Sequence, residues 1–245
     1  MKAMIFAAGI GKRLQPISEH TPKALVRLGE KTMLELVAEK LIRFGVTSIV
    51  VNIHHHPQKM REFISGMKYP GVAFVVSDES DLLLDTGGGL LKAKEHLAGS
   101  DPFILHNVDV LSDINLGAMV KFHRDNKALA TLAVTRRKTS RYFLFEKARL
   151  EGWENTQTGQ ITICNPQPGQ HLERKAFSGV HVINPKLLDL IIETGVFPIN
   201  DLYLRLASGH DILCFEHDPE HWADIGTPDK LENARKLFFE NPGIF

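Results

Sequence analysis

Short apolar runs alternate with segments of helical periodicity through the first half of the chain. The pattern is clearest at residues 33–44, where Leu34, Val37, Ala38 and Leu41 recur on one helical stripe. Strands that alternate with helices build parallel βαβ units, and helices then cover both faces of the sheet. The sequence therefore predicts a three-layer α/β/α fold around a mostly parallel sheet. The expected strands lie at 3–8, 48–53, 72–76 and 103–109, and the expected helices at 33–44, from 57, after 89 and at 115–126.

The pattern becomes β-rich after about residue 128. Further strands are expected at 130–135, 142–145, 160–164 and 180–183, with turns near Gly152 and at Thr158-Gly159. Pro185 is expected to open a helix, and Thr227 to cap the last one. No repeat, low-complexity tract or linker interrupts the chain. We therefore expect residues 1–245 to form a single domain with two halves, at about 1–128 and about 129–245.

A glycine loop follows the first expected strand. Gly9 and Gly11, separated by one residue, allow a tight turn that brings bare backbone close to a ligand. Successive backbone N–H groups in such a turn form an anion-binding concavity. Arg13 and Lys23 add a planar guanidinium and a mobile ammonium, both of which bind phosphate oxygens. The segment predicts a polyphosphate site. The alternative is a tight turn whose two cations are merely solvated.

Two other phosphate-binding loops are excluded by particular residues. A Walker loop needs a Lys-Ser/Thr pair directly after its last glycine, whereas Lys12-Arg13 follows Gly11. The dinucleotide fingerprint needs a third glycine where this chain has Leu14, and an acidic residue where it has Asn52-Ile53-His54. A dinucleotide-dependent oxidoreductase is therefore disfavoured.

Two aspartates are candidate ligands for a hard cation. Asp109 ends a buried strand, and ligands of α/β sheets bind at the carboxyl ends of the strands. Asp224 stands between apolar neighbours just before Gly226. Mg²⁺ prefers oxygen ligands, so this pair suits phosphoryl or nucleotidyl transfer. Each aspartate could instead belong to a turn or cap, and position alone leaves both interpretations open.

Further glycines suggest close approach of a ligand. The run Gly87-Gly88-Gly89 is expected to precede a helix. Three consecutive glycines lose much conformational entropy on folding, which makes physical sense where a flat nucleobase must lie against bare backbone. A flexible loop is the alternative. In the second half, Gly179 could admit a substrate and Lys175 could reach a sugar phosphate.

Composition argues against several functions. Lys+Arg and Asp+Glu both number 29, and this zero net charge argues against a nucleic-acid partner. Two cysteines, Cys164 and Cys214, indicate no disulfide framework and favour a reducing compartment. The chain shows neither an apolar stretch of membrane-spanning length nor a signal-peptide pattern. We therefore expect a cytoplasmic protein with no membrane partner.

Taken together, these motifs resemble the sugar-1-phosphate nucleotidyltransferases, also called nucleotide-sugar pyrophosphorylases. The family signature, Gly-x-Gly-x-Arg followed by Pro and Pro-Lys, is present as Gly9 to Arg13, Pro16 and Pro22-Lys23. The short bacterial branch of N-acetylmuramate-1-phosphate uridylyltransferases also matches at 86–89, 177–179 and 222–228. One departure is Val108, because the family usually has Gly before the metal-binding Asp.

The resemblance implies a Rossmann-like nucleotidyltransferase fold with a mixed sheet and a role for each motif. Arg13 would bind the β- and γ-phosphates, Lys23 would hold the phosphates at the reacting centre, and Asp109 and Asp224 would bind Mg²⁺. The residues implied in nucleotide binding are Ala8, Gly9, Gly11, Gly87 and Gly88, and those implied in sugar binding are Asn107, Lys175 and Gly179.

The implied reaction transfers a nucleotidyl group from a nucleoside triphosphate to a sugar 1-phosphate and releases pyrophosphate. UTP and N-acetylmuramate 1-phosphate are the favoured substrates. The alternatives are mannose, glucose or heptose 1-phosphate with GTP, CTP or dTTP, or a catalytically weakened nucleotide-sugar-binding regulator. We expect a monomer or homodimer without the C-terminal β-helix of longer relatives.

Overall fold

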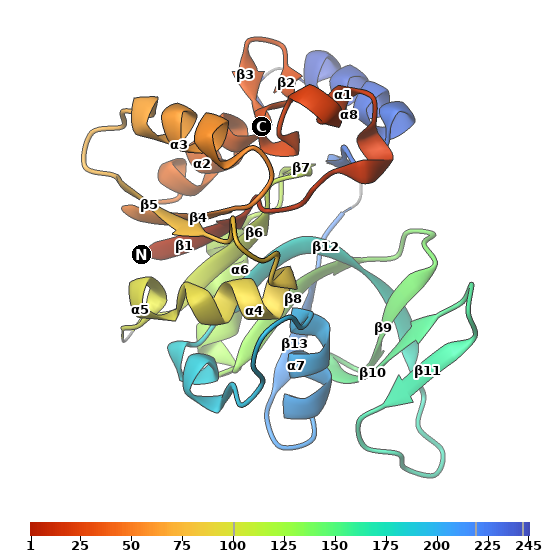
Figure 1. Ribbon diagram of the computed structural model, residues 1–245. Helices are drawn as coiled ribbons and strands as arrows, with labels where there is room; N and C mark the ends of the chain where they lie inside the picture. The colour runs from red at the N-terminus through yellow and green to blue at the C-terminus, as the bar shows by residue number, and fades with distance from the viewer. Residues whose placement is uncertain (100, 219, 242) are drawn as a thin grey trace.

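A mixed ten-stranded sheet runs through the computed structural model, which describes residues 1–99, 101–218, 220–241 and 243–245 (Figure 1). Its strand order is β11-β10-β13-β8-β12-β6-β1-β4-β5, and β9 pairs with both β10 and β12. Two small two-stranded sheets, β2–β3 and β7–β14, accompany it. The strands are β1 (Lys2–Phe6), β2 (Arg27–Leu28), β3 (Lys31–Thr32), β4 (Ser48–Ile53), β5 (Ala73–Asp78), β6 (Phe103–Asn107), β7 (Val110–Ser112), β8 (Ala130–Thr135), β9 (Arg141–Glu146), β10 (Arg149–Asn155), β11 (Gln160–Ile163), β12 (Glu173–Ile183), β13 (Ile212–Glu216) and β14 (Trp222–Asp224).

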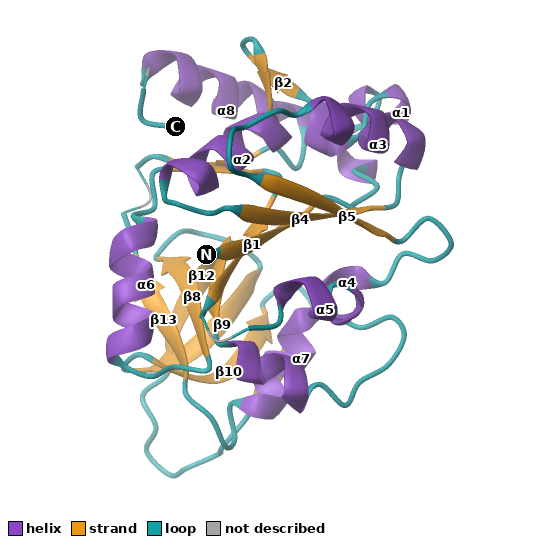
Figure 2. Ribbon diagram, turned by 90° about the vertical axis from the view of Figure 1, so that its left-hand side faces the viewer, coloured by secondary structure: helices purple, strands orange, loops and turns teal. Residues whose placement is uncertain are grey.

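Helices cover both faces of this sheet (Figure 2). One face packs against α2, α3 and α6 around Ile5, Ile49 and Ile104, and the other packs against α4 and α7 around Met4 and Leu105. The helices are η1 (Lys12–Leu14), α1 (Ile17–His20), η2 (Lys23–Leu25), α2 (Met33–Arg43), α3 (Pro57–Gly66), α4 (Asp85–Lys92), α5 (Lys94–Leu97), α6 (Leu116–Asp125), η3 (Pro185–Leu190), α7 (Ile199–Leu206) and α8 (Pro228–Glu240). No helix in the described part of the chain is long and apolar enough to cross a bilayer.

The first half forms the parallel part of the sheet, as the alternation of strands and helices predicts. β1 pairs in parallel with β4 and with β6, and β4 pairs in parallel with β5. Their apolar side chains are buried on both faces, because helices lie above and below. The loops after these strands therefore open at one edge of the sheet, where α/β proteins bind ligands.

The second half continues the same sheet in mostly antiparallel pairing. The long strand β12 pairs with β6, β8 and β9, and so joins the two halves. Its pairing with β8 shifts register between Phe177 and His181, a bulge that includes Gly179 at φ +81°. A bulge bends a strand and redirects its side chains. In this chain the bulge lies where β12 passes β7.

Several local expectations are wrong for identifiable reasons. The run Gly87-Gly88-Gly89 lies inside α4 rather than before a helix, because neighbouring segments pack too closely for side chains there. Gly152 lies within β10, not in a turn; it pairs with Ile163 of β11, and a Cβ at this position would collide with the Thr162 carbonyl oxygen. Pro185 opens a 3₁₀ helix, and the expected strand 180–183 begins at Glu173.

Other local expectations are confirmed. Thr227 caps α8, with its hydroxyl accepting the Lys230 N–H at 3.4 Å, and Pro228 occupies the first helical position. Gly45 follows α2 at φ +100°, the left-handed conformation that glycine adopts after a helix end. The turn at Thr158-Gly159 joins β10 to β11.

Candidate active site

A pocket of about 430 Å³ lies at the carboxyl ends of the parallel strands. Phe6 at the end of β1, Asn52 in β4 and Asn107 at the end of β6 contribute to its wall. The lining also includes Ala7, Ala8, Gly9, Lys23, Glu79, Leu83, Asp85, Thr86, Val108, Asp109 and Val196. The structure therefore brings the glycine loop, Lys23 and Asp109 to one cavity.

The glycine loop has the open backbone that its sequence predicts. Gly9 is exposed, and no atom would lie within 4 Å of a Cβ added there, so a ligand can approach its backbone. Gly11 adopts φ +71°, a left-handed conformation that side chains disfavour. The Ser18 hydroxyl donates to the Gly11 carbonyl at 2.8 Å and holds the turn in place.

Lys23 and Asp109 form an ion pair inside the pocket. The Lys23 ammonium donates to the Asp109 carboxylate, and both side chains are largely shielded from solvent, at 13% and 26% exposure. Lys23 comes from η2, whereas Asp109 follows β6, 86 residues later in the chain. The fold thus places a cation and an anion next to each other in the pocket that the glycine loop also lines.

Asp224 approaches Asp109 through the small sheet β7–β14. Val110 pairs with Asp224, and the Ile225 N–H donates to the Asp109 carbonyl at 3.0 Å, so both aspartates lie at the same end of this sheet. The Asp224 carboxylate accepts hydrogen bonds from the Gly226 N–H at 2.9 Å and from the Lys230 ammonium at 2.6 Å. Sequence inspection did not reveal this pairing, because each strand has only three residues.

Arg13 reaches the same area from the glycine loop. A Cβ added to Gly226 would lie 3.6 Å from Arg13 Nη2 and 2.7 Å from Asp224 Oδ1, so the guanidinium lies beside the Asp224 turn. Arg13 is exposed, and within the described residues it forms no ion pair. Its guanidinium is therefore free to bind an anion.

A buried polar network supports the other side of the pocket. The side-chain oxygen Oδ1 of Asn52 accepts a hydrogen bond from the Ala7 N–H at 2.7 Å, and the side-chain nitrogen Nδ2 of Asn52 donates to Glu79 Oε1 at 2.7 Å. Glu79 is fully buried and also accepts the Leu84 N–H at 3.1 Å. Glu79 was missed as a site residue, although its position directly after β5 was a usable signal.

Gly87 and Gly88 do not line the pocket. The Gly87 and Gly88 N–H groups donate to the Phe197 carbonyl at 2.9 and 3.2 Å, and a Cβ on Gly87 would lie 2.8 Å from that oxygen. A Cβ on Gly88 would collide with the Gly195 carbonyl. The glycines therefore allow α4 to pack against residues 195–197, and Asp85 and Thr86 are the residues of α4 that face the pocket.

The residues expected around the sugar separate into two places. Asn107 lines the pocket, and its amide nitrogen would lie 3.2 Å from a Cβ on Gly179, so these two residues are neighbours. Lys175 lies elsewhere on β12 and is nearly buried. Its ammonium bonds to Glu216 at 2.9 Å and lies 3.7 Å from Glu173. Burial by itself lowers the pKa of Lys175, but the hydrogen bond to Glu216 and the negative charges around the ammonium together outweigh burial and raise it.

Arg137 is a cation near Asp224 that the motifs did not reveal. It follows β8, donates to the Phe177 carbonyl at 2.7 Å and stacks over the Trp222 ring, 4.1 Å from the centroid. Burial lowers its pKa, and the nearby Asp224 charge opposes that change. Its Nε is buried and has no hydrogen-bond partner among the described residues.

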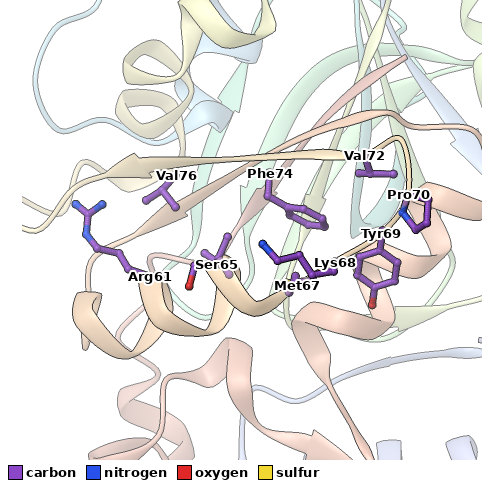
Figure 3. A pocket seen from close by; sticks show the side chains of 10 residues that line it. Arg61, Ser65, Met67, Lys68, Tyr69, Pro70, Val72, Phe74 and Val76 are labelled. Carbon is purple, nitrogen blue, oxygen red and sulfur yellow. The ribbon is translucent and has the colours of Figure 1, made fainter.

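A groove between α3 and the edge strand β5 is separate from this site (Figure 3). Phe74 and Val76 line it from the strand and Val72 from just before the strand, and Arg61 and Lys68 come from α3 and the turn after it. None of the residues predicted for the active site lines this groove. The chemistry therefore concentrates at the strand ends rather than at the sheet edge.

Comparison with solved structures supports the fold. The chain is similar to UDP-glucose pyrophosphorylase of Acinetobacter baumannii, with TM-score 0.78 and 17% identity over 99% of this chain and 95% of that one. It is also similar to the inositol-1-phosphate CTP transferase of T. maritima, with TM-score 0.72 and 18% identity over 96% and 94%. The expected α/β nucleotidyltransferase fold is confirmed.

Curated relatives extend the likeness to sequence. A mannose-1-phosphate guanyltransferase of Yarrowia lipolytica is 31% identical over 251 residues, and mannose-1-phosphate guanyltransferase beta-A of Xenopus laevis is 30% identical over 252 residues. Each match covers 98% of this chain and 65% of the relative, so the chain spans about two thirds of their length. The profile of the family described as Nucleotidyl transferase matches residues 2–240. The match spans both halves of the sheet and every strand-end residue described above, and the chain belongs to the Nucleotidyl transferase family.

Proposed function

We propose that this protein transfers a nucleotidyl group from a nucleoside triphosphate to a sugar 1-phosphate. The observation that carries the proposal is the convergence of Arg13 and Lys23 with Asp109 and Asp224 at the glycine-loop pocket. Cations in such a site stabilise the charge on transferring phosphoryl groups and on departing pyrophosphate. Membership of the family supports the same class of chemistry.

The proposed step is a direct displacement. A sugar-phosphate oxygen attacks the α-phosphorus, the bond from that phosphorus to the bridging oxygen breaks, and pyrophosphate leaves with the electron pair. Arg13, which is free of ion pairs within the described residues, would hold the β- and γ-phosphates, and Lys23 would hold the phosphates at the reacting centre. The step needs alignment and charge neutralisation rather than a nucleophilic side chain.

Asp109 and Asp224 suit a Mg²⁺ ion. Both carboxylates have limited exposure, at 26% for Asp109 and 17% for Asp224, and each forms an ion pair with a lysine. A bound divalent cation would supply the positive charge that the lysine now supplies to each carboxylate. Within the described residues no cluster of three or more His, Cys, Asp or Glu forms, so phosphate oxygens and water would complete the coordination. When bound, the metal would neutralise charge on the triphosphate.

GTP and mannose 1-phosphate are the substrates that we favour. The curated relatives reported above are named for mannose 1-phosphate and guanylyl transfer, which supports this alternative over UTP and N-acetylmuramate 1-phosphate. The chemistry of the pocket agrees, because the exposed Asp85 contributes a carboxylate to its lining. Ionised carboxylates only accept hydrogen bonds, and guanine offers two adjacent donors, N1–H and its 2-amino group, where uracil offers one.

The test is a substrate matrix with the purified full chain and Mg²⁺. Pyrophosphate release is measured for GTP, UTP, CTP and dTTP against mannose, glucose and N-acetylmuramate 1-phosphates. We expect the highest kcat/KM for GTP with mannose 1-phosphate, and we expect Lys23→Met to reduce it about 100-fold or more. Lys12→Met is the matched control, because Lys12 is exposed on the same loop and does not line the pocket. No pyrophosphate from any pair would refute the proposal.

Val108 favours a second candidate, a nucleotide-sugar-binding regulator with weakened catalysis. Its side chain is 4% exposed in the pocket wall, and its N–H donates to the Phe6 carbonyl at 3.1 Å. A β-branched residue there stiffens the backbone next to Asp109. This candidate predicts nucleotide binding without turnover, with Val108→Gly restoring activity. Ordinary turnover by the native chain would exclude it.

A further inference from the structure

A second and larger cleft lies at the opposite end of the sheet from the candidate active site. Its volume is about 900 Å³, against about 430 Å³ for the strand-end pocket. Pro102, immediately before β6, lines the cleft, and Asn107, at the far end of β6, lines the pocket. Asn107 is five positions after Pro102 along an extended strand, or about 16 Å at roughly 3.3 Å per residue. The two cavities are therefore distinct sites.

Cationic side chains from separate segments converge on this cleft. Arg124 and Lys127 come from the end of α6 and the turn after it, Arg149 from the start of β10 and Lys186 from η3. They outnumber the two carboxylates in the lining, Asp189 and Asp211. The whole chain has a formal net charge of zero, so this positive excess is local. An excess of this kind favours an anionic ligand.

Existing ion pairs leave two of these four cations free. Arg149 lies 3.2 Å from Asp211, and Arg124 lies 3.8 Å from Asp101. Asp189 lies 3.0 Å from Lys94, which is outside the cleft. Within the described residues, Lys127 and Lys186 form neither an ion pair nor a side-chain hydrogen bond. Two unpaired ammonium groups in one concave wall suit a phosphate, which accepts several charge-assisted hydrogen bonds.

We propose that this cleft binds a sugar phosphate at a site separate from the strand-end pocket. Lys127 and Lys186 hold the phosphate. Asp189, Asp211 and the Asn184 side chain, all in the lining, supply partners for sugar hydroxyls. This site goes beyond the proposed function, because no residue of its lining belongs to the glycine loop or the aspartate pair.

The test is calorimetric titration of the full chain with glucose 6-phosphate at low ionic strength. We compare the native protein with Lys127→Ala/Lys186→Ala, and with Lys121→Ala/Lys236→Ala as a control that removes the same charge from exposed positions on α6 and α8. The cleft variant should bind about tenfold or more weakly, and the control should bind as the native protein does. Equal weakening in both variants would overturn the proposal.

Two further measurements separate this site from the active site and test the ligand class. Arg13→Ala/Lys23→Ala, which disables the strand-end pocket, should keep one glucose 6-phosphate site; its complete loss would overturn the proposal. Inorganic phosphate should bind more weakly than glucose 6-phosphate, and equal affinity would exclude a role for the sugar.

Discussion

Gly87→Ala provides the sharpest test of how α4 is packed. In the structure a Cβ at position 87 would lie 2.8 Å from the Phe197 carbonyl oxygen and even closer to the Phe197 ring. That oxygen also accepts the Gly87 N–H at 2.9 Å, so moving it away would lengthen a buried hydrogen bond. The ring is only 8% exposed and has little room to turn aside. The substitution therefore forces backbone or core to shift.

The expected magnitude follows from two opposing terms. Replacing a helical glycine by alanine favours the helix by about 1 kcal/mol. Overpacking a well-filled site costs about 1–3 kcal/mol, and the upper end applies because the clash includes backbone. We expect a net loss of about 2 kcal/mol, or a fall in Tm of about 4–8 °C for a chain of this size.

Gly66→Ala is the matched control. Gly66 is the last residue of α3, and nothing lies within 4 Å of its ideal Cβ. The same chemical change should leave stability unchanged or raise it by up to about 1 kcal/mol. Urea unfolding of both variants, together with GTP titration, is the assay. If Gly87→Ala unfolds like the native protein but binds GTP more weakly, the packing interpretation is refuted and the nucleobase-platform interpretation is favoured.

Three other predictions concern charge, pH and capping. Lys23→Met should abolish most pyrophosphate release while changing Tm by little, because its Asp109 partner stays partly solvated; a large loss of stability would contradict a mainly catalytic role. Burial lowers the pKa of His106 and of His181 to about 3, below the value of about 6.5 in an unfolded chain. Between about pH 3 and about pH 6.5 the unfolded state therefore binds more protons than the folded state. The free energy of unfolding should fall as the pH is lowered through this range, by up to about 1.4 kcal/mol per pH unit for each histidine. Equal urea midpoints at pH 7.5 and 5 would contradict this. Thr227→Ala should cost about 1 kcal/mol by removing the cap of α8, and Thr227→Ser should retain most of the stability in thermal unfolding.

Local signals predicted much of the first half. The stripe Leu34, Val37, Ala38 and Leu41 predicts α2 within one residue at its end, because helical periodicity is a property of neighbouring residues. Strand β4 has the expected limits for a similar reason, since its apolar run is bounded by turn residues. The position of Asp109 after β6 also followed from the rule that ligands bind at the carboxyl ends of strands.

Long-range contacts explain why the structure places some predicted site residues away from the pocket. Lys175 has the residue type expected of a phosphate ligand, but Glu216 on β13 pairs with it from 41 residues away. Gly87 and Gly88 have a composition typical of a ligand platform, but residues 195–197 lie against them. Neither partner can be inferred from neighbouring residues, because only the packing of distant segments brings them together.

The sequence by itself determined the glycine loop, the cations Arg13 and Lys23, and the layered α/β/α arrangement, since turn chemistry and hydrophobic periodicity are local. Tertiary structure alone decided that Asp224 reaches Asp109 through the β7–β14 pair and that Glu79 is buried behind the loop. It also decided that a cationic cleft forms at the end of the sheet opposite the candidate active site. These features depend on segments up to about a hundred residues apart, and the free energy of burying a shared core, rather than any local preference, brings such segments into contact.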